Sequence, residues 1–387
     1  MIQTAHPGHT VLYAGTGPEL TRYEVDVKAF TLVKRDSVTL PANVQYAWPH
    51  ATKKFFYVAS SDRVAVRGGP LGTTHHVAAF RVDPHSGALR AHGAPVALKH
   101  RPIHMTTDLD SRHVLIAYCK PSGLSVHRIN DDGAIGDEVV QPPLDAGVYA
   151  HQIRVTPDNR TAILVTRGHG KPYEAGALKV FKYKDGLLGA EISICPGGAN
   201  GFGPRHLDFH SSQPWVYVSF EDQHQLGLFE LKGNRLSSEP LFTKDTLAEP
   251  GNLRPLQYAG TVHLHPNGRF VYVAERASGT TGVDGKQVFS GGENAIVVYA
   301  IDARTGEPTL IQHAQTRGLH PRTFALDAGG RMLVAANKAP VPMNDGTITP
   351  ASLDIFRVGA DGRLNYVRQY EVDTGGGPLW WMGMLTH

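Results

Sequence analysis

The stretch Gly203–Leu231, GPRHLDFHSSQPWVYVSFEDQHQLGLFEL, contains three short runs of strand-forming residues separated by turn residues. These runs are Arg205–Phe209, Trp215–Val218 and Leu226–Leu231. Because they are rich in β-branched and aromatic residues, they predict an antiparallel meander. A meander of three or four strands cannot bury both of its faces alone, so we expect copies of it elsewhere in the chain.

Copies of its turn and second strand recur along the chain. They are Pro49–Val58, Asp108–Ala117, Thr156–Val165, His265–Val273 and Asp327–Ala335. The period is 48 to 62 residues when the residues at the end of each turn are aligned, namely Lys54, Arg112, Arg160, Pro214, Arg269 and Arg331. A period of about 50 residues built from four short strands is typical of a β-propeller blade.

The two ends of the chain complete one further blade. Val11–Ala14 resembles a second strand that has no first strand before it, whereas Gly375–Met382 resembles a first strand with nothing after it. Joining them removes the open edges that invite aggregation. We therefore predict an all-β protein with one domain over residues 1–387. It is a seven-bladed β-propeller of four-stranded antiparallel blades, whose closing blade combines residues 10–40 with 375–386.

Composition excludes several classes of protein. A net charge of +3 is spread too thinly for a nucleic-acid footprint. No run reaches the roughly 20 apolar residues of a membrane helix. Cys119 and Cys195 are too few for a disulfide framework, and the start MIQTAHPGHT lacks the pattern of a signal peptide. We expect a cytoplasmic monomer or small homo-oligomer that binds neither nucleic acid nor membrane.

Four connections between second and third strands are long and rich in Gly, Pro and polar residues: Ser61–Thr74, Gly168–Gly176, Ala277–Glu293 and Ala339–Ser352. All would emerge on one face of a propeller. They are either tolerated surface insertions or a rim or lid around that face.

Two rings of residues should meet at one mouth of the central channel, because first strands begin and second strands end at the same edge. The first-strand ring is Ile103, His151, Arg205, Gly260 and Arg322. The second-strand ring is Ser61, Cys119, Arg167, Glu221, Arg276 and Lys338, and His104, His206 and His320 lie beside the rings. In a purely structural repeat the strand ends need no charged residues, whereas these ring positions contain four Arg, one Lys, one Glu and one His.

A cationic cluster with one carboxylate suits an anionic small molecule, since guanidinium groups donate paired hydrogen bonds to carboxylate or phosphate. Glu221 or His151 is then a candidate general base, and an arginine a candidate oxyanion stabiliser. The bland alternative is salt bridging between blades, for example of Glu221 with Arg205 or Arg276.

Other residues carry weaker signals. His263 and His265 are two apart on one strand, but no Cys, Asp or Glu at fixed spacing completes a metal site, so we predict no metal and no cofactor. Phosphate-binding, nucleophile-elbow and zinc-protease motifs do not occur in a fitting context. Trp380-Trp381 is interpreted as core packing of the closing strand.

The chain resembles the lactonase family of seven-bladed propellers, which includes the bacterial 6-phosphogluconolactonase of propeller type and the fungal 3-carboxy-cis,cis-muconate lactonizing enzyme. The resemblance covers nearly the whole chain. It rests on Gly203-Pro204-Arg205-His206 followed by Glu221, on His151-Gln152-Ile153-Arg154, and on His320-Pro321-Arg322-Thr323-Phe324 leading to Ala336-Asn337.

The resemblance implies catalytic roles for His151, Glu221, Arg205 and Arg276. The other charged and histidine positions around the mouth are then expected to bind substrate: His104, Arg167, His206, Glu275, His320, Arg322 and Lys338. Two residues depart from the family, which usually has Asn at the positions of Phe220 and Glu275. The extra carboxylate of Glu275 is expected either to pair with Arg276 or to bind substrate.

Three functions remain open. The first is a lactonase that hydrolyses an anionic sugar-acid or carboxy-lactone, as in carbohydrate metabolism. The second is a cycloisomerase of aromatic catabolism that interconverts a muconate-type dicarboxylate and its lactone. The third is a non-catalytic propeller, which should instead present apolar residues at its mouth. A redox quinoprotein propeller is disfavoured, because such a protein is expected to have a secretion signal and disulfides, and this sequence predicts neither.

Overall fold

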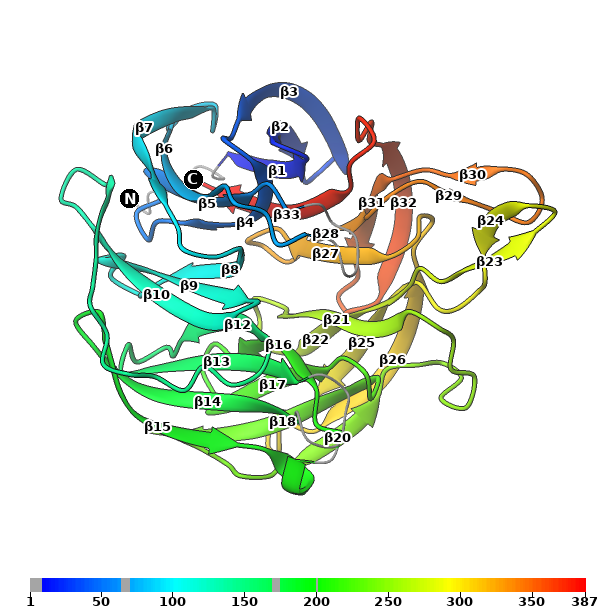
Figure 1. The fold of residues 1–387 in the computed structure, drawn as a ribbon. Helices are drawn as coiled ribbons and strands as arrows, with labels where there is room; N and C mark the ends of the chain where they lie inside the picture. The colour runs from blue at the N-terminus through cyan, green and yellow to red at the C-terminus, as the bar shows by residue number, and fades with distance from the viewer. Residues whose placement is uncertain (1–8, 64–69, 169–174, 200) are drawn as a thin grey trace, which may run out of the picture.

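The computed structural model describes residues 9–63, 70–168, 175–199 and 201–387. Its sheets are small and antiparallel, and Figure 1 shows them arranged around a common centre. The one helical element in these ranges is a 3₁₀ turn at Pro196–Ala199, and no described helix is long and apolar enough to cross a membrane.

Three blades are regular four-stranded meanders. Their strands, from the channel outward, are β4 (Asn43–Pro49), β5 (Phe55–Ser61), β6 (His75–Val82) and β7 (Leu89–Ala97); β8 (Pro102–Thr107), β9 (His113–Cys119), β10 (Ser122–Ile129) and β11 (Ile135–Glu138); and β12 (Ala150–Val155), β13 (Thr161–Gly168), β14 (Ala175–Lys184) and β15 (Leu187–Ile194).

The stretch Gly203–Leu231 forms the inner part of the next blade. Its strands are β16 (Pro204–Phe209), β17 (Trp215–Phe220) and β18 (Gln225–Lys232), and the outer position is divided between β19 (Arg235–Leu236) and β20 (Phe242–Asp245).

The remaining two complete blades carry insertions. Their strands are β21 (Gln257–Leu264), β22 (Phe270–Ala277), β25 (Ala295–Ile301) and β26 (Pro308–Gln315); and β27 (Pro321–Leu326), β28 (Met332–Asn337), β31 (Ser352–Val358) and β32 (Leu364–Glu371). The hairpins β23 (Thr280–Val283)–β24 (Lys286–Phe289) and β29 (Val341–Pro342)–β30 (Ile348–Thr349) occupy the two long connections.

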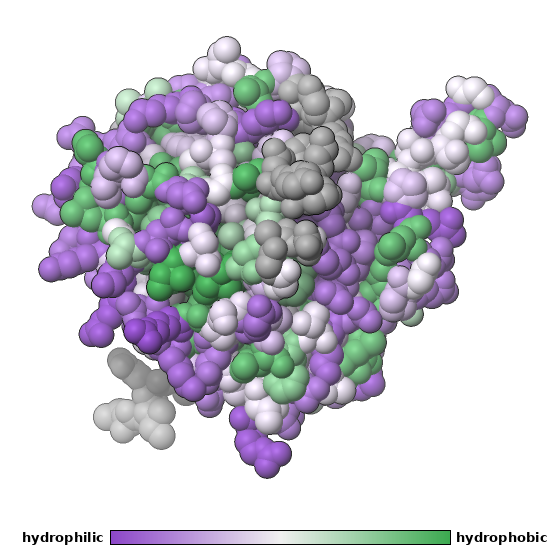
Figure 2. All heavy atoms as spheres, turned by 60° about the horizontal axis from the view of Figure 1, so that its bottom comes forward, coloured by the Kyte–Doolittle hydropathy of each residue, from purple (hydrophilic) through white to green (hydrophobic). Residues whose placement is uncertain are grey.

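These two hairpins lie beside each other and project outward from the ring, as Figures 1 and 2 show. The other two long connections fall partly on residues 64–69 and 169–174, which lie outside the described residues.

The closing blade is confirmed. β33 (Leu379–Thr386) is its inner strand and pairs antiparallel with β1 (Thr10–Thr16), which continues into β2 (Glu19–Asp26) and β3 (Thr31–Thr39). Around the axis each inner strand contacts the next, and β33 contacts β4. The ring of seven blades is therefore closed by strands from the two ends of the chain.

The core is divided among the interfaces between blades. Among the described residues there are seven clusters of buried apolar side chains, and each joins the facing sides of two neighbouring blades. Tyr217 also links two blades by a hydrogen bond. Its buried hydroxyl donates at 2.7 Å to the Gly306 carbonyl, in the turn between the third and fourth strands of the next blade. Tyr13, Tyr57 and Tyr272 make the same bond to Gly87, Gly133 and Gly362. Packing and these bonds fix how neighbouring blades are oriented, and so fix the rim of the channel.

Candidate active site

A β-bulge occurs at the same place in every blade. Near its start each inner strand has an extra residue relative to the second strand, so the register shifts there. The extra residues are Gln45, Ile103, His151, Arg205, Gly260 with Thr261, Arg322 and Trp380. A bulge re-aims a side chain that a regular strand would send to a sheet face. The predicted first-strand ring coincides with five of these seven positions.

Glu221 is the centre of a buried clamp. Its Oε1 accepts hydrogen bonds from Arg205 Nη1 at 2.6 Å and from Arg276 Nη2 at 2.5 Å. Arg167 forms an ion pair with the other carboxylate oxygen. Glu221, Arg205 and Arg276 are each at most 4% exposed. The structure thus joins two rings that were predicted from separate parts of the sequence, and the salt bridges named as the bland alternative are real contacts.

The glycine of the first-strand ring makes room for this clamp. A Cβ at Gly260 would lie 3.0 Å from Arg276 Nε and 3.2 Å from the Ala274 carbonyl oxygen. Arg276 can therefore cross this position to reach Glu221, while its Nη1 lies 3.2 Å from His320 Nε2.

The clamp leaves Glu221 charged and weakly basic. Burial acts to raise the pKa of Glu221, but Arg167, Arg205 and Arg276 outweigh burial and bring that pKa down to about 2. Burial, together with repulsion from Arg276, lowers the pKa of Arg205 to about 9. A carboxylate with these partners is a poor acceptor for a further proton, so its evident role is to hold three guanidinium groups in place.

Four buried histidines surround the same region: His104, His151, His206 and His320. The ring centroids of His151 and His206 are 5.1 Å apart, and those of His206 and His104 are 6.1 Å apart. Burial is the main cause that lowers the pKa of all four imidazoles well below 6.5, and nearby arginines add to the effect. These rings are neutral at pH 7, and neutral His151 has a lone pair with which to accept a proton.

This histidine group predicts acid sensitivity. Below pH 6.5 the unfolded chain binds protons on these four side chains that the folded chain does not, so the free energy of unfolding should fall. Each such histidine costs up to about 1.4 kcal/mol per pH unit. His104→Phe should lessen the dependence by about one proton, measured by urea unfolding between pH 5 and 7.5. The control His85→Phe changes an exposed histidine; equal slopes in the two variants would contradict the prediction.

The opposite wall of the mouth is cationic, and its three basic side chains, Arg101, Arg322 and Lys338, form no ion pair with a carboxylate among the described residues. Arg322 lies with its guanidinium carbon 3.7 Å from the centre of a Trp380 ring, and its Nε donates a 2.9 Å hydrogen bond to the Trp380 carbonyl. Lys338 Nζ and the Arg101 guanidinium carbon lie 5.5 and 5.4 Å from that ring. Arg101 Nε also donates to Gln45 Oε1 at 2.8 Å.

Sequence reasoning missed Gln45, Arg101 and Trp380. Trp381 does pack in the core, at 6% exposure, but Trp380 is at the bulge and lines a cavity of about 720 Å³ at the mouth. The available signal was the alignment of Gly375–Met382 with the Gly-Pro-Arg-His segment. One extra residue separates Pro378 from Trp380, which hides the equivalence with Pro204 and Arg205.

The two departures from the family pattern point away from the mouth. Phe220 is in the core between blades and contacts Phe202, with ring centroids 5.1 Å apart. Glu275 is fully buried and bonds to His224 Nδ1 at 3.2 Å and to the Thr246 hydroxyl. Successive side chains on a strand face opposite ways, so each departure lies behind a clamp residue. The carboxylate of Glu275, which was expected to pair with Arg276 or to bind substrate, instead has His224 and Thr246 as its hydrogen-bond partners.

His263 and His265 do not converge. His263 Nδ1 is 3.6 Å from Asp208 Oδ2, whereas His265 Nε2 donates a 2.8 Å hydrogen bond to the Gly330 carbonyl in the turn between β27 and β28. No group of three or more His, Cys, Asp or Glu side chains within the described ranges is arranged to hold a metal ion. Of the second-strand ring, Ser61 hydrogen-bonds His75 and Cys119 is half-buried.

Comparison with known proteins identifies relatives of the whole fold. A family model described as lactonase, 7-bladed β-propeller, matches residues 8–341. The periplasmic gluconolactonase of Pseudomonas aeruginosa superposes with a TM-score of 0.76 at 23% identity, covering 97% of this chain and 99% of that one. A putative 6-phosphogluconolactonase from Bacteroides fragilis gives 0.72 at 19% identity, covering 100% and 99%. At these identities the two structures show a shared fold.

Proposed function

The chain belongs to the lactonase family of seven-bladed β-propellers, and from that premise we propose that it hydrolyses a lactone carrying an anionic group at the mouth described above. Family membership supports lactone hydrolysis in general. The observation that carries the finer proposal is the pairing of a buried neutral imidazole, His151, with fixed guanidinium groups on one rim.

The proposed reaction needs one base and one site for developing negative charge. Water attacks the lactone carbonyl while His151 accepts its proton. The oxygen that becomes negative is stabilised by a clamp arginine, Arg205 or Arg276, an effect worth about 10²–10³ in rate for a single donor. The intermediate then collapses, the ring C–O bond breaks, and the proton on His151 passes to the leaving alkoxide. The product is the open hydroxy acid.

Glu221 contributes through the arginines. By bonding Arg205, Arg276 and Arg167 at once, it keeps their forks oriented before substrate arrives, so little reorganisation is needed during the reaction. We therefore give Glu221 a positioning role and His151 the role of general base. From the sequence alone, either residue was a candidate for the base.

Product analysis in ¹⁸O-labelled water tests the proposal. The purified protein should convert members of a panel of sugar-acid lactones to hydroxy acids that carry one ¹⁸O in the new carboxylate. Muconate-type dicarboxylates are included because a cycloisomerase would interconvert them with their lactones without net water uptake. Turnover of muconates alone, or of no compound in the panel, would overturn the hydrolase proposal.

A further inference from the structure

The mouth contains two cationic regions of different character. In the clamp, three guanidinium groups share the Glu221 carboxylate. On the other wall, Arg101, Arg322 and Lys338 surround Trp380, and none of the three has a carboxylate partner within the described part of the chain. Arg101 is only 8% exposed, and its contact is to the neutral amide of Gln45. Buried cations are costly unless something negative pairs with them.

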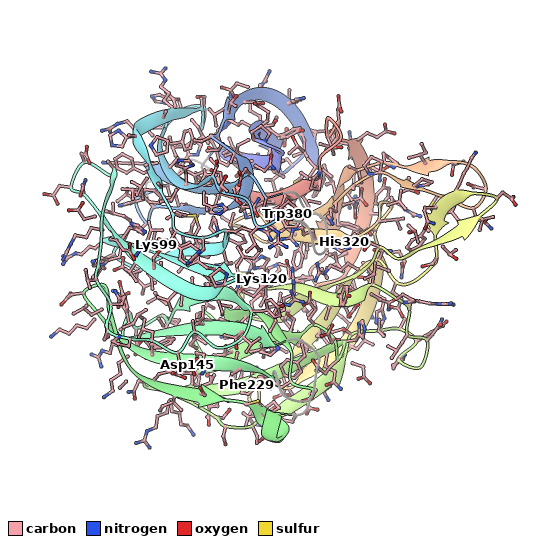
Figure 3. All side chains as sticks on the ribbon, in the orientation of Figure 1. Lys99, Lys120, Asp145, Phe229, His320 and Trp380 are labelled. Atoms are coloured by element: carbon pink, nitrogen blue, oxygen red, sulfur yellow. The ribbon has the colours of Figure 1, made fainter. Side chains whose placement is uncertain are left out.

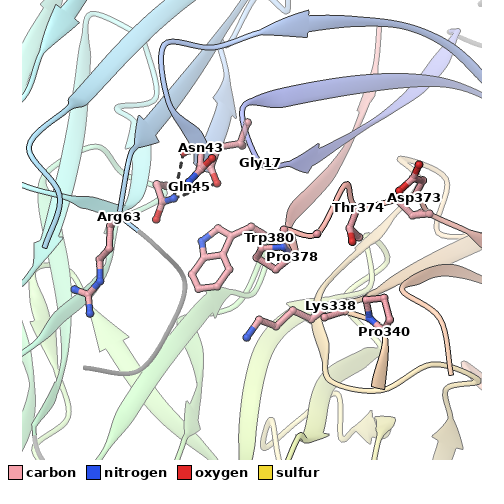
Figure 4. Close-up of a pocket in the computed structure, with 15 residues that line it drawn as sticks. Gly17, Asn43, Gln45, Arg63, Lys338, Pro340, Asp373, Thr374, Pro378 and Trp380 are labelled. Carbon is pink, nitrogen blue, oxygen red and sulfur yellow. Dashed lines mark hydrogen bonds between the residues drawn. The ribbon is translucent and has the colours of Figure 1, made fainter. Parts of the chain in front are cut away.

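The cavity beside this wall is largely apolar, and Arg63, Lys338 and Trp380 supply hydrogen-bond donors to it. Figure 4 shows Lys338 and Trp380 extending into one space, with Arg63 across from them. The indole Nε1 of Trp380 is buried and has no acceptor among the described residues. Asp373 also lines the cavity, but its carboxylate accepts a 2.9 Å hydrogen bond from the Gly375 amide, and Figure 4 shows it at the right of the view, across Trp380 from Arg63. Figure 3 places Trp380 and His320 near the common centre of the blades.

We propose that Lys338, Arg101, Arg322 and the Trp380 indole form a second subsite, which binds an oxyanion group on an arm of the substrate while the lactone ring lies over His151 and the clamp. The bound group is a carboxylate or a phosphate, because both consist of acceptors that match the ammonium, guanidinium and indole donors gathered around Trp380. The position of the lactone ring over His151 rests on the proposed function. The subsite itself depends only on the charges and the cavity.

The state of Lys338 supports this assignment. Burial, with repulsion from Arg322 and Arg276, lowers the pKa of Lys338 to about 8. The amine is therefore mostly protonated at pH 7, and a bound anion would offset the repulsion that disfavours its charge. Lys338 is the best residue to alter, because methionine keeps most of the length of its side chain without the ammonium group.

Isothermal titration with inorganic phosphate and, separately, acetate tests the subsite without any turnover. At pH 7 and low ionic strength, where screening is weak, at least one anion should bind saturably. Lys338→Met should weaken that binding about tenfold, as expected for loss of a charge-assisted bond. Lys99→Met, a control at an exposed ion pair with Glu138, should bind as the wild type does. No saturable binding of either anion, or equal affinity in Lys338→Met, would overturn the subsite.

Kinetics then test the two-point arrangement. Lys338→Met should lower kcat/KM for an anionic lactone about tenfold more than for a neutral lactone of the same ring, mainly through KM. Equal losses for both lactones would refute the placing of the arm. The two proposals fail separately: anion binding without lactone turnover removes only the proposed function, whereas turnover without anion binding removes only the subsite.

Discussion

Glu221→Gln should lower the free energy of unfolding by about 3–5 kcal/mol and reduce kcat/KM at least a hundredfold. Glutamine preserves the size of the side chain but removes the charge that Arg167, Arg205 and Arg276 share. The buried guanidinium groups of Arg205 and Arg276 and the half-buried one of Arg167 would then face one another without an anion. Urea unfolding monitored by circular dichroism, together with initial rates on the best lactone, measures both effects.

A second substitution keeps this prediction testable if the variant folds poorly. Arg276→Met in the Glu221→Gln background removes one of the stranded cations, so the double variant should be less destabilised than the sum of the two single changes. Glu307→Gln is the matched control, because its partner Lys244 lies in a solvent-exposed pair where a loss below about 1 kcal/mol is expected. Additive effects, or a fully stable and active Glu221→Gln protein, would show that the clamp does not have this role.

The architecture was predictable because it depends on a repeated local pattern. Each blade has its own turn and its own apolar second strand, such as Trp215–Phe220 and Phe270–Ala277, and six imperfect copies of one unit reinforce one another. The closing blade also followed from the unmatched strands at Val11–Ala14 and Gly375–Met382, and the pairing of β1 with β33 confirms it. Such signals are short in range, so no knowledge of side-chain packing was needed.

The sequence predicted which residues lie at the rim of the channel, but not which side chains contact one another there. The repeat period placed Arg205, Glu221 and Arg276 at one edge, and the structure brings their side chains together. The partners of Glu275 are Thr246 and His224, which belong to the neighbouring blade and are set by packing rather than by spacing. Trp380 was missed for another reason, since a one-residue difference in register moves a side chain from the core to the channel.

His151→Asn should lower kcat about 10²- to 10⁴-fold, the usual contribution of a general base, while KM and stability at pH 7.5 change little. The imidazole is buried and neutral, so asparagine removes the proton acceptor without removing a charge. In the wild type, kcat should stay level from neutral pH down to below 6.5 and decline only where this depressed pKa is reached. Single-turnover rates measured across pH 5–8 would report the chemical step directly.

Comparison with Glu221→Gln decides which residue takes the proton. If His151 is the base, His151→Asn loses rate but keeps the stability that Glu221→Gln loses, because the three arginines still share their carboxylate. His85→Asn, at an exposed site, controls for loss of an imidazole elsewhere. If His151→Asn instead retained most of its activity, a proton acceptor other than His151 would be required. Glu221 would then have to act as a base despite its three cationic partners, at the cost of the contacts that keep its pKa at about 2.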